Sequence, residues 1–206
     1  GYRGKLTRTF TIDAAVYRND FQDFINTQVV LSPLYGEVGD GGLSVLAMAN
    51  GDFETWSSYT NSPAEISSWG VSIGAQTKIF GNFDLSANYT KSKLEFEQDL
   101  YPDFRTNWNT PEHKIKAQFG NTSLFENFGF NVAWRYWSEY LWQASFGDGM
   151  VPETHVLDAQ INLTVPKWKS TIKVGATNLG GEEYFTAFGS GFIGTQYYIS
   201  WTANNF

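Results

Sequence analysis

The chain has 206 residues, no cysteine, a formal net charge of −7, and equal 17% shares of aromatic and of charged residues. The acidic balance, with scattered Lys and Arg, argues against nucleic acid as a partner. The absence of cysteine excludes disulfides, thiol catalysis and Cys-ligated metals. No run approaches the ~20 apolar residues that a transmembrane helix needs, so helical membrane passage is excluded too.

Eight segments alternate apolar and polar residues with a period of two, which predicts β-strands. In the third segment, Phe83, Leu85 and Ala87 lie on one face, whereas Asp84 and Ser86 lie on the other. The segments in chain order are residues 9–16, 68–79, 83–90, 114–119, 128–136, 157–165, 171–177 and 197–203.

The links between these segments are alternately long and short. The short links are residues 81–82, 122–127 and 166–169, and the long links are residues 27–63, 97–112, 141–155 and 179–195. Strict alternation places all short links at one end of the strands, which is typical of the periplasmic turns and extracellular loops of an outer-membrane β-barrel. The aromatic residues near the segment ends are predicted to form the interfacial girdles; they are Tyr17, Trp69, Tyr89, Tyr136, Trp137, Tyr140, Trp168 and Trp201.

A soluble β-sandwich or lipocalin-like barrel is the alternative, because periodicity does not tell an inward apolar face from an outward one. The loops at one end and the aromatic excess favour the membrane barrel.

Eight strands can also close a small barrel by themselves. Its narrow interior would then have to hold a set of charged residues that pair densely with one another, whereas a wide, water-filled lumen accommodates them more easily. These residues are Asp13, Asp84, Lys114, Lys116, Arg135, Asp158 and Lys173.

The chain shows no pattern typical of catalysis or of metal binding. His113 and His155 are far apart, and no HExxH, GxSxG or P-loop spacing occurs. The sequence therefore predicts no enzyme, no catalytic residue, no cofactor and no metal site. The alternative is a hydrolytic group at the rim, made by His155 with Glu153 and Asp148.

Aromatic residues are also frequent in the long links. Exposed aromatic rings stack on sugars or anchor partner proteins, so these residues are candidates for contact with a substrate or a partner. The alternative is that they pack the loops against one another. The candidates are Tyr35, Trp56, Tyr59, Trp108, Trp142, Phe188 and Phe192. Tyr101 is a further aromatic residue of the long links.

Several short strings resemble one family when they are taken in order. They are Asn109–Lys114, Trp134–Trp137, Phe146–Pro152, Leu157–Gln160, Lys169–Leu179 and Gly194–Ser200, preceded by Gly1–Gly4 and Tyr17–Phe21. In this order and spacing, the chain resembles the C-terminal end of a TonB-dependent outer-membrane receptor, of the SusC-like or related type typical of Bacteroidetes.

The resemblance implies an all-β, transmembrane antiparallel β-barrel of 22 strands with an N-terminal plug. Residues 1–206 would be its last eight strands, with Gly1–Arg3 as the tail of the preceding strand. It also implies active import of a glycan, a peptide or a metal chelate across the outer membrane of a Gram-negative bacterium. The implied partners are membrane lipid and lipopolysaccharide, the rest of the barrel and plug, the TonB complex through the plug, and a SusD-like surface lipoprotein.

The same resemblance implies a terminal signal for barrel assembly, formed by Tyr197, Ile199, Trp201 and Phe206. Phe206 is one residue out of phase with the other three, and a bulge near Asn204 would restore the alternation. A structural or interaction component of a larger outer-membrane assembly is the other interpretation of the chain.

Overall fold

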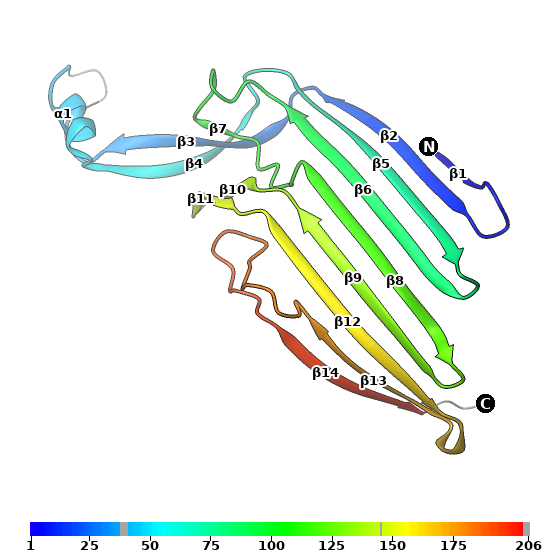
Figure 1. Ribbon diagram of the computed structural model, residues 1–206. Helices are drawn as coiled ribbons and strands as arrows, with labels where there is room; N and C mark the ends of the chain where they lie inside the picture. Colours follow the sequence, from blue (N-terminus) through cyan, green and yellow to red (C-terminus); the bar gives the residue numbers. More distant parts are fainter. Residues whose placement is uncertain (38–40, 145, 204–206) are drawn as a thin grey trace.

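The computed structural model describes residues 1–37, 41–144 and 146–203. Its main element is an antiparallel sheet in which each strand pairs with the next sheet strand along the chain (Figure 1). The nine strands are β1 (Tyr2–Lys5), β2 (Thr11–Phe21), β5 (Ile66–Ile79), β6 (Phe83–Glu95), β8 (His113–Phe125), β9 (Phe128–Trp137), β12 (Thr154–Val165), β13 (Ser170–Thr177) and β14 (Gln196–Ala203).

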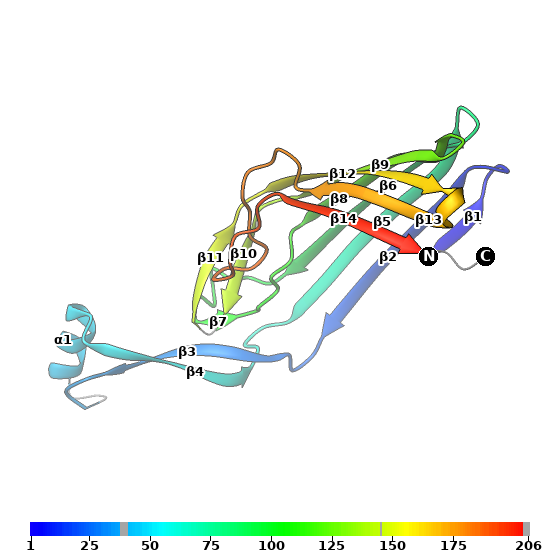
Figure 2. The ribbon, with the colours of Figure 1, turned by 90° about the horizontal axis from the view of Figure 1, so that it is seen from below.

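All eight predicted strands are present, and β1 adds the predicted tail of a preceding strand, since Tyr2 pairs with Ala14 of β2. The sheet curves into an open trough between its edge strands β1 and β14 (Figure 2). The predicted all-β barrel wall is thus confirmed. Asn204 and Phe206, which carry the predicted terminal bulge, lie outside the described residues.

The short links are tight turns at one end of the sheet (Figure 1). Between β5 and β6, Phe80 and Gly81 both have positive φ angles, of 47° and 89°. Such angles match the right-handed twist of a hairpin, and glycine adopts them without steric cost. The 3₁₀ helix Pro166–Trp168 makes the turn between β12 and β13.

The long links contain regular structure that the sequence did not predict. β3 (Ile25–Pro33) and β4 (Phe53–Asn61) form a hairpin with α1 (Leu43–Asn50) at its tip, and this hairpin projects from the sheet (Figure 1). β7 (Phe104–Arg105) pairs with β3, and β10 (Tyr140–Ala144) pairs with β11 (Gly147–Val151). Both faces of the β3–β4 ribbon are largely exposed, so its sequence lacks the alternation that identifies a strand with one covered face.

One face of the sheet is apolar, and no element of the described residues packs a core against it. Leu85 pairs with Phe119, which pairs with Val132 on the next strand. Ile199, also on this outer face, is 75% exposed. A continuous apolar face without a protein partner is what a lipid-facing wall requires. No helix of the described residues is long and apolar enough to cross a membrane.

Candidate ligand-binding lumen and mouth

The other face of the sheet, the inner face, carries the predicted inward charges, and its carboxylates are paired. Asp13 lies 3.7 Å from Arg3, Asp84 lies 3.0 Å from Lys78, and Asp158 lies 2.8 Å from Arg135. The acidic charge of this face is therefore neutralised locally.

The Arg135–Asp158 pair is the least exposed of the three. The Nη2 atom of Arg135 contacts both carboxylate oxygens of Asp158, at 3.0 and 2.8 Å. Asp158 Oδ1 also accepts a 3.1 Å hydrogen bond from the backbone N–H of Asn178. This carboxylate ties β9, β12 and the end of β13 together.

On β8 and β13, the inner-face lysines Lys114, Lys116 and Lys173 form no ion pair within the described part of the chain. Lys114 and Lys116 follow one another on this face of β8, about 6–7 Å apart along the strand. The inner face is thus electropositive beside β8, although the whole chain carries a charge of −7.

Two tyrosines lie flat across glycines of the inner face. The ring of Tyr198 covers Gly175, and its hydroxyl donates a 2.9 Å hydrogen bond to Gln160 one strand further on. Tyr17 covers Gly70 in the same way, with its hydroxyl 3.2 Å from Ser92 Oγ. The predicted place of Tyr17 in a membrane girdle is therefore wrong.

A pocket of about 280 Å³ opens where the inner face meets the long links. We call it the mouth pocket. Strands β8, β9 and β10 and the links before β8 and before β14 all contribute to it. Its lining residues are Asn109, Pro111, Lys114, Trp137, Tyr140, Trp142 and Thr186.

Asn109 and Tyr140, two polar residues of the mouth pocket, already have hydrogen-bond partners. Asn109 bonds the backbone of Gln143 twice, at 2.7 and 2.9 Å, and the hydroxyl of Tyr140 donates a 2.6 Å bond to the carbonyl of Thr186. Burial raises the pKa of the Tyr140 phenol. The indole N–H groups of Trp137 and Trp142 are buried without an acceptor, and each unmade bond of this kind costs about 1–3 kcal/mol.

Beside the pocket, a network of side-chain amides connects three of the long links by hydrogen bonds. Gln143 Oε1 accepts hydrogen bonds from Thr106 Oγ1 and from the backbone of Asn107, at 3.3 and 3.1 Å. Asn107 Nδ2 donates a 2.7 Å bond to Asn26 on β3. The pocket is thus framed by links that hold one another in place.

The sequence profile of the TonB dependent receptor-like β-barrel family matches residues 1–179 of the chain. The chain belongs to this family. Receptors of the family lie in the outer membrane of Gram-negative bacteria and are transport proteins rather than enzymes. A comparison with curated protein sequences finds no match.

Solved structures of this kind share the fold of this receptor chain. It is similar to the copper transporter OprC, with a TM-score of 0.65 and 15% identity, over 95% of this chain and 28% of that one. It is similar to the siderophore receptor PiuA from Acinetobacter baumannii, with a TM-score of 0.57 and 16% identity, over 95% and 24%. The ferric-catecholate import receptor Fiu from E. coli K12 gives a TM-score of 0.58 and 15% identity, over 90% and 23%. The chain therefore spans less than a third of these receptors' lengths.

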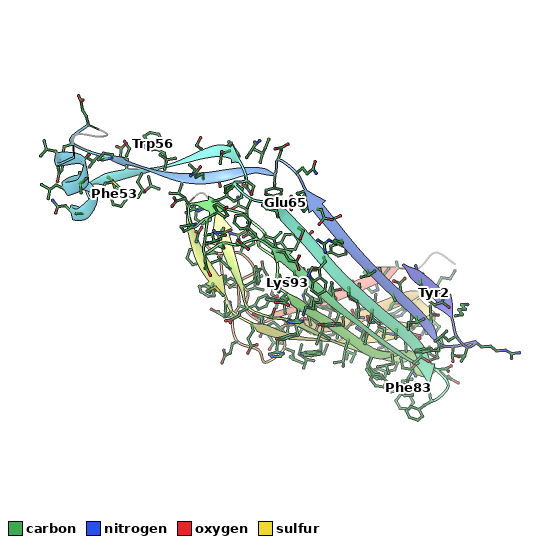
Figure 3. All side chains as sticks on the ribbon, turned by 90° about the horizontal axis from the view of Figure 1, so that it is seen from above. Tyr2, Phe53, Trp56, Glu65, Phe83 and Lys93 are labelled. Atoms are coloured by element: carbon green, nitrogen blue, oxygen red, sulfur yellow. The ribbon has the colours of Figure 1, made fainter. Side chains whose placement is uncertain are left out.

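The predicted loop aromatics of this TonB-dependent receptor chain do not converge on one site. Trp142 alone lines the mouth pocket. Trp56 lies exposed on β4, on the projecting hairpin (Figure 3). Tyr59, on the same strand, is exposed too. Tyr35 donates a 3.0 Å bond to Asp52 of the same hairpin, and Trp108 lies between β7 and β8.

The remaining loop aromatics contact their neighbours within the links. Phe188 covers Gly149 of β11, and the ring centroid of Phe192 lies 5.5 Å from that of Phe185. Tyr101 lies 5.9 Å from Phe96, centroid to centroid. Contact of any of these residues with a substrate or a partner stays a prediction.

Two pocket residues were assigned to a membrane girdle by sequence, wrongly. Trp137 lines the mouth pocket opposite Lys114, and Tyr140 lines it from β10. The signal for Trp137 was present, because Tyr136 and Trp137 are consecutive in a strand and must point to opposite faces. Tyr136 is the outward one, beside Ile115 and His155.

Of the hydrolytic alternative, Asp148 lies apart from His155, whereas Glu153 accepts a 3.4 Å hydrogen bond from the hydroxyl of Tyr136 beside His155. Asp148 is held by Arg105, at 3.4 Å, near the amide network. His155 lies on the outer face, stacked against Trp134 and Tyr136 with centroid distances of 5.8 and 4.8 Å. The described residues contain no group of His, Cys, Asp and Glu arranged to hold a metal ion.

Proposed function

We propose that residues 1–206 form one domain, the C-terminal part of the barrel of an outer-membrane TonB-dependent importer. The two-faced curved sheet carries this proposal: one face suits lipid and the other suits a water-filled lumen. The free edges of β1 and β14 within the described residues support a larger barrel, which we expect to have 22 strands and to enclose a plug.

The imported nutrient is proposed to bind between the long links, the inner face and the plug. The related structures support a small ligand, since their names describe copper, siderophore and ferric-catecholate transport. Glycans and peptides are the other classes that the sequence resemblance favours. The TonB complex would drive transport by acting on the plug.

A SusC-like receptor would also have a SusD-like surface lipoprotein as partner. The short strings from Asn109 to Ser200 and the projecting β3–β4 hairpin support this proposal. The hairpin exposes Trp56 (Figure 3), and Leu43 and Val45 at its tip are exposed as well. Affinity purification of the full receptor from its native membrane tests this proposal. Recovery of the receptor without any surface lipoprotein would contradict it.

Uptake by the native bacterium tests the importer itself. Deleting the gene should abolish accumulation of one labelled metal chelate, glycan or peptide, and the intact gene should restore it. Loss of the TonB complex should abolish the same uptake while the receptor stays at the surface. Unchanged uptake of all three classes after deletion would refute the proposal.

A further inference from the structure

The ligand chemistry of the mouth pocket follows from the polar groups that remain unused there. Four side-chain groups of the lining residues have no hydrogen-bond partner among the described residues: the ammonium of Lys114, the hydroxyl of Thr186 and the buried indole N–H groups of Trp137 and Trp142. All four can donate a hydrogen bond, and only the hydroxyl can also accept one. The side-chain oxygens of Asn109 and Tyr140 already have partners, and no carboxylate lines the pocket.

The walls and the size of the pocket restrict the ligand further. Trp137, Tyr140 and Trp142 supply aromatic rings, which suit a flat group. A volume of about 280 Å³ lies just below the range of complete small-molecule sites. The pocket therefore takes one ring-sized end of a ligand, and the rest of the ligand lies in the lumen.

The electrostatic surroundings favour an anionic end group. Lys116 follows Lys114 on the inner face of β8 and forms no ion pair with a described residue. The nearby inner-face carboxylate of Asp158 is neutralised by Arg135. Two unpaired ammonium groups in succession give a positive potential along the approach to the pocket.

A larger hollow, of about 490 Å³, lies at the end of β2, β5 and β6. Four carboxylates line it, Asp20, Glu65, Glu95 and Glu97, with a single basic residue, Arg18. Ile66 and Ser67, which also line it, are consecutive in β5 and point to opposite faces of the sheet. This hollow therefore lies at the strand ends, and its acidic lining does not suit an anionic group.

We propose that the mouth pocket binds a carboxylate carried on a flat ring, as one end of the imported ligand. Lys114 forms the ion pair, the two indole N–H groups donate to the carboxylate after side-chain rotation, and the aromatic rings stack on the ligand ring. This inference rests on the proposed function, since it places the group in the lumen of an importer.

The test uses the full-length purified receptor in detergent and two probes of the same shape, 4-fluorobenzoate and 4-fluorobenzamide, followed by ¹⁹F NMR. The charged probe should bind about tenfold more tightly than the amide, as one charge-assisted hydrogen bond predicts. Lys114→Gln should remove this preference, and Lys114→Arg should retain it. Trp142→Phe should weaken both probes and the carboxylate more, because the indole N–H bond to an anion is charge-assisted.

Lys173→Gln is the matched control, since Lys173 is an unpaired inner-face lysine that does not line the mouth pocket. It should keep the full preference. Equal binding of the two probes to the wild type, or a preference that survives Lys114→Gln, would overturn the inference. Carboxylate binding in a receptor that fails every uptake assay would refute the importer and leave the pocket standing. Uptake by a receptor that shows no preference for the carboxylate probe would refute the pocket and leave the importer standing.

Discussion

The hydroxyl of Tyr198 on β14 donates a 2.9 Å hydrogen bond to Oε1 of Gln160 on β12, across the intervening strand β13. The contact exists only because residue 175, which lies between them, is glycine: a Cβ there would lie 2.5 Å from the tyrosine ring. Strand β14 is thus held to the sheet by a side-chain hydrogen bond as well as by its backbone hydrogen bonds to β13.

Gly175→Ala should therefore destabilise the barrel, because the new methyl group displaces the Tyr198 ring and breaks its bond to Gln160. We expect a loss of about 1–3 kcal/mol in unfolding free energy, typical of overpacking. Denaturant titration of the refolded full-length protein measures it. Gly191→Ala is the control, since nothing lies within 4 Å of a Cβ at that position. Equal effects of the two substitutions would contradict the proposed role of Gly175.

The Arg135–Asp158 pair should contribute more to stability than the Lys78–Asp84 pair. Asp158 is only 24% exposed in its side chain and also accepts a backbone hydrogen bond, whereas the side chains of Lys78 and Asp84 are 52% and 38% exposed. Double-mutant cycles with Asn and Gln replacements should give a coupling of about 1–3 kcal/mol for the first pair and below about 1 kcal/mol for the second. Similar couplings would show that solvent screens both pairs equally.

Chemical labelling in intact cells should reveal the orientation of the sheet. The chain contributes no cysteine of its own, so the labelling gained over the unsubstituted receptor reports the one new thiol. Tyr59→Cys on the projecting hairpin should react with a membrane-impermeant maleimide in intact cells. Trp168→Cys, in a short turn at the other end, should react only after the outer membrane is permeabilised. The opposite labelling pattern would reverse the assigned topology.

Acid should remove the contribution of the Lys91–Glu112 pair at the outer end of β6. The hydrogen bond from Lys91, 3.1 Å away, holds the pKa of Glu112 below its ordinary value of 4.5. A carboxyl with a lowered folded-state pKa stabilises the fold above its unfolded-state pKa, and this stability is lost as the pH falls through the folded value. The wild type should therefore exceed Glu112→Gln in stability at neutral pH, and the difference should vanish once the pH has fallen through the lowered pKa of Glu112. A constant difference over this fall in pH would exclude the pair as its cause.

The sequence alone predicted the eight strands, their two faces and the one-ended loops. These features are local, because side chains alternate along a strand and a lipid-facing surface must be apolar along its whole length. The predicted terminal bulge near Asn204 lies outside the described residues and stays a prediction.

Only the tertiary structure revealed the regular structure of the long links and the pocket that they form with the inner face. The β3–β4 ribbon has no covered face and so left no alternating pattern, and the cross-strand partners of Trp137 and Tyr17 depend on register. The mouth pocket joins Lys114, Trp142 and Thr186 from distant parts of the chain. Such convergence depends on the curvature of the sheet and on hydrogen bonds between long links, and neither is encoded in any short stretch of sequence.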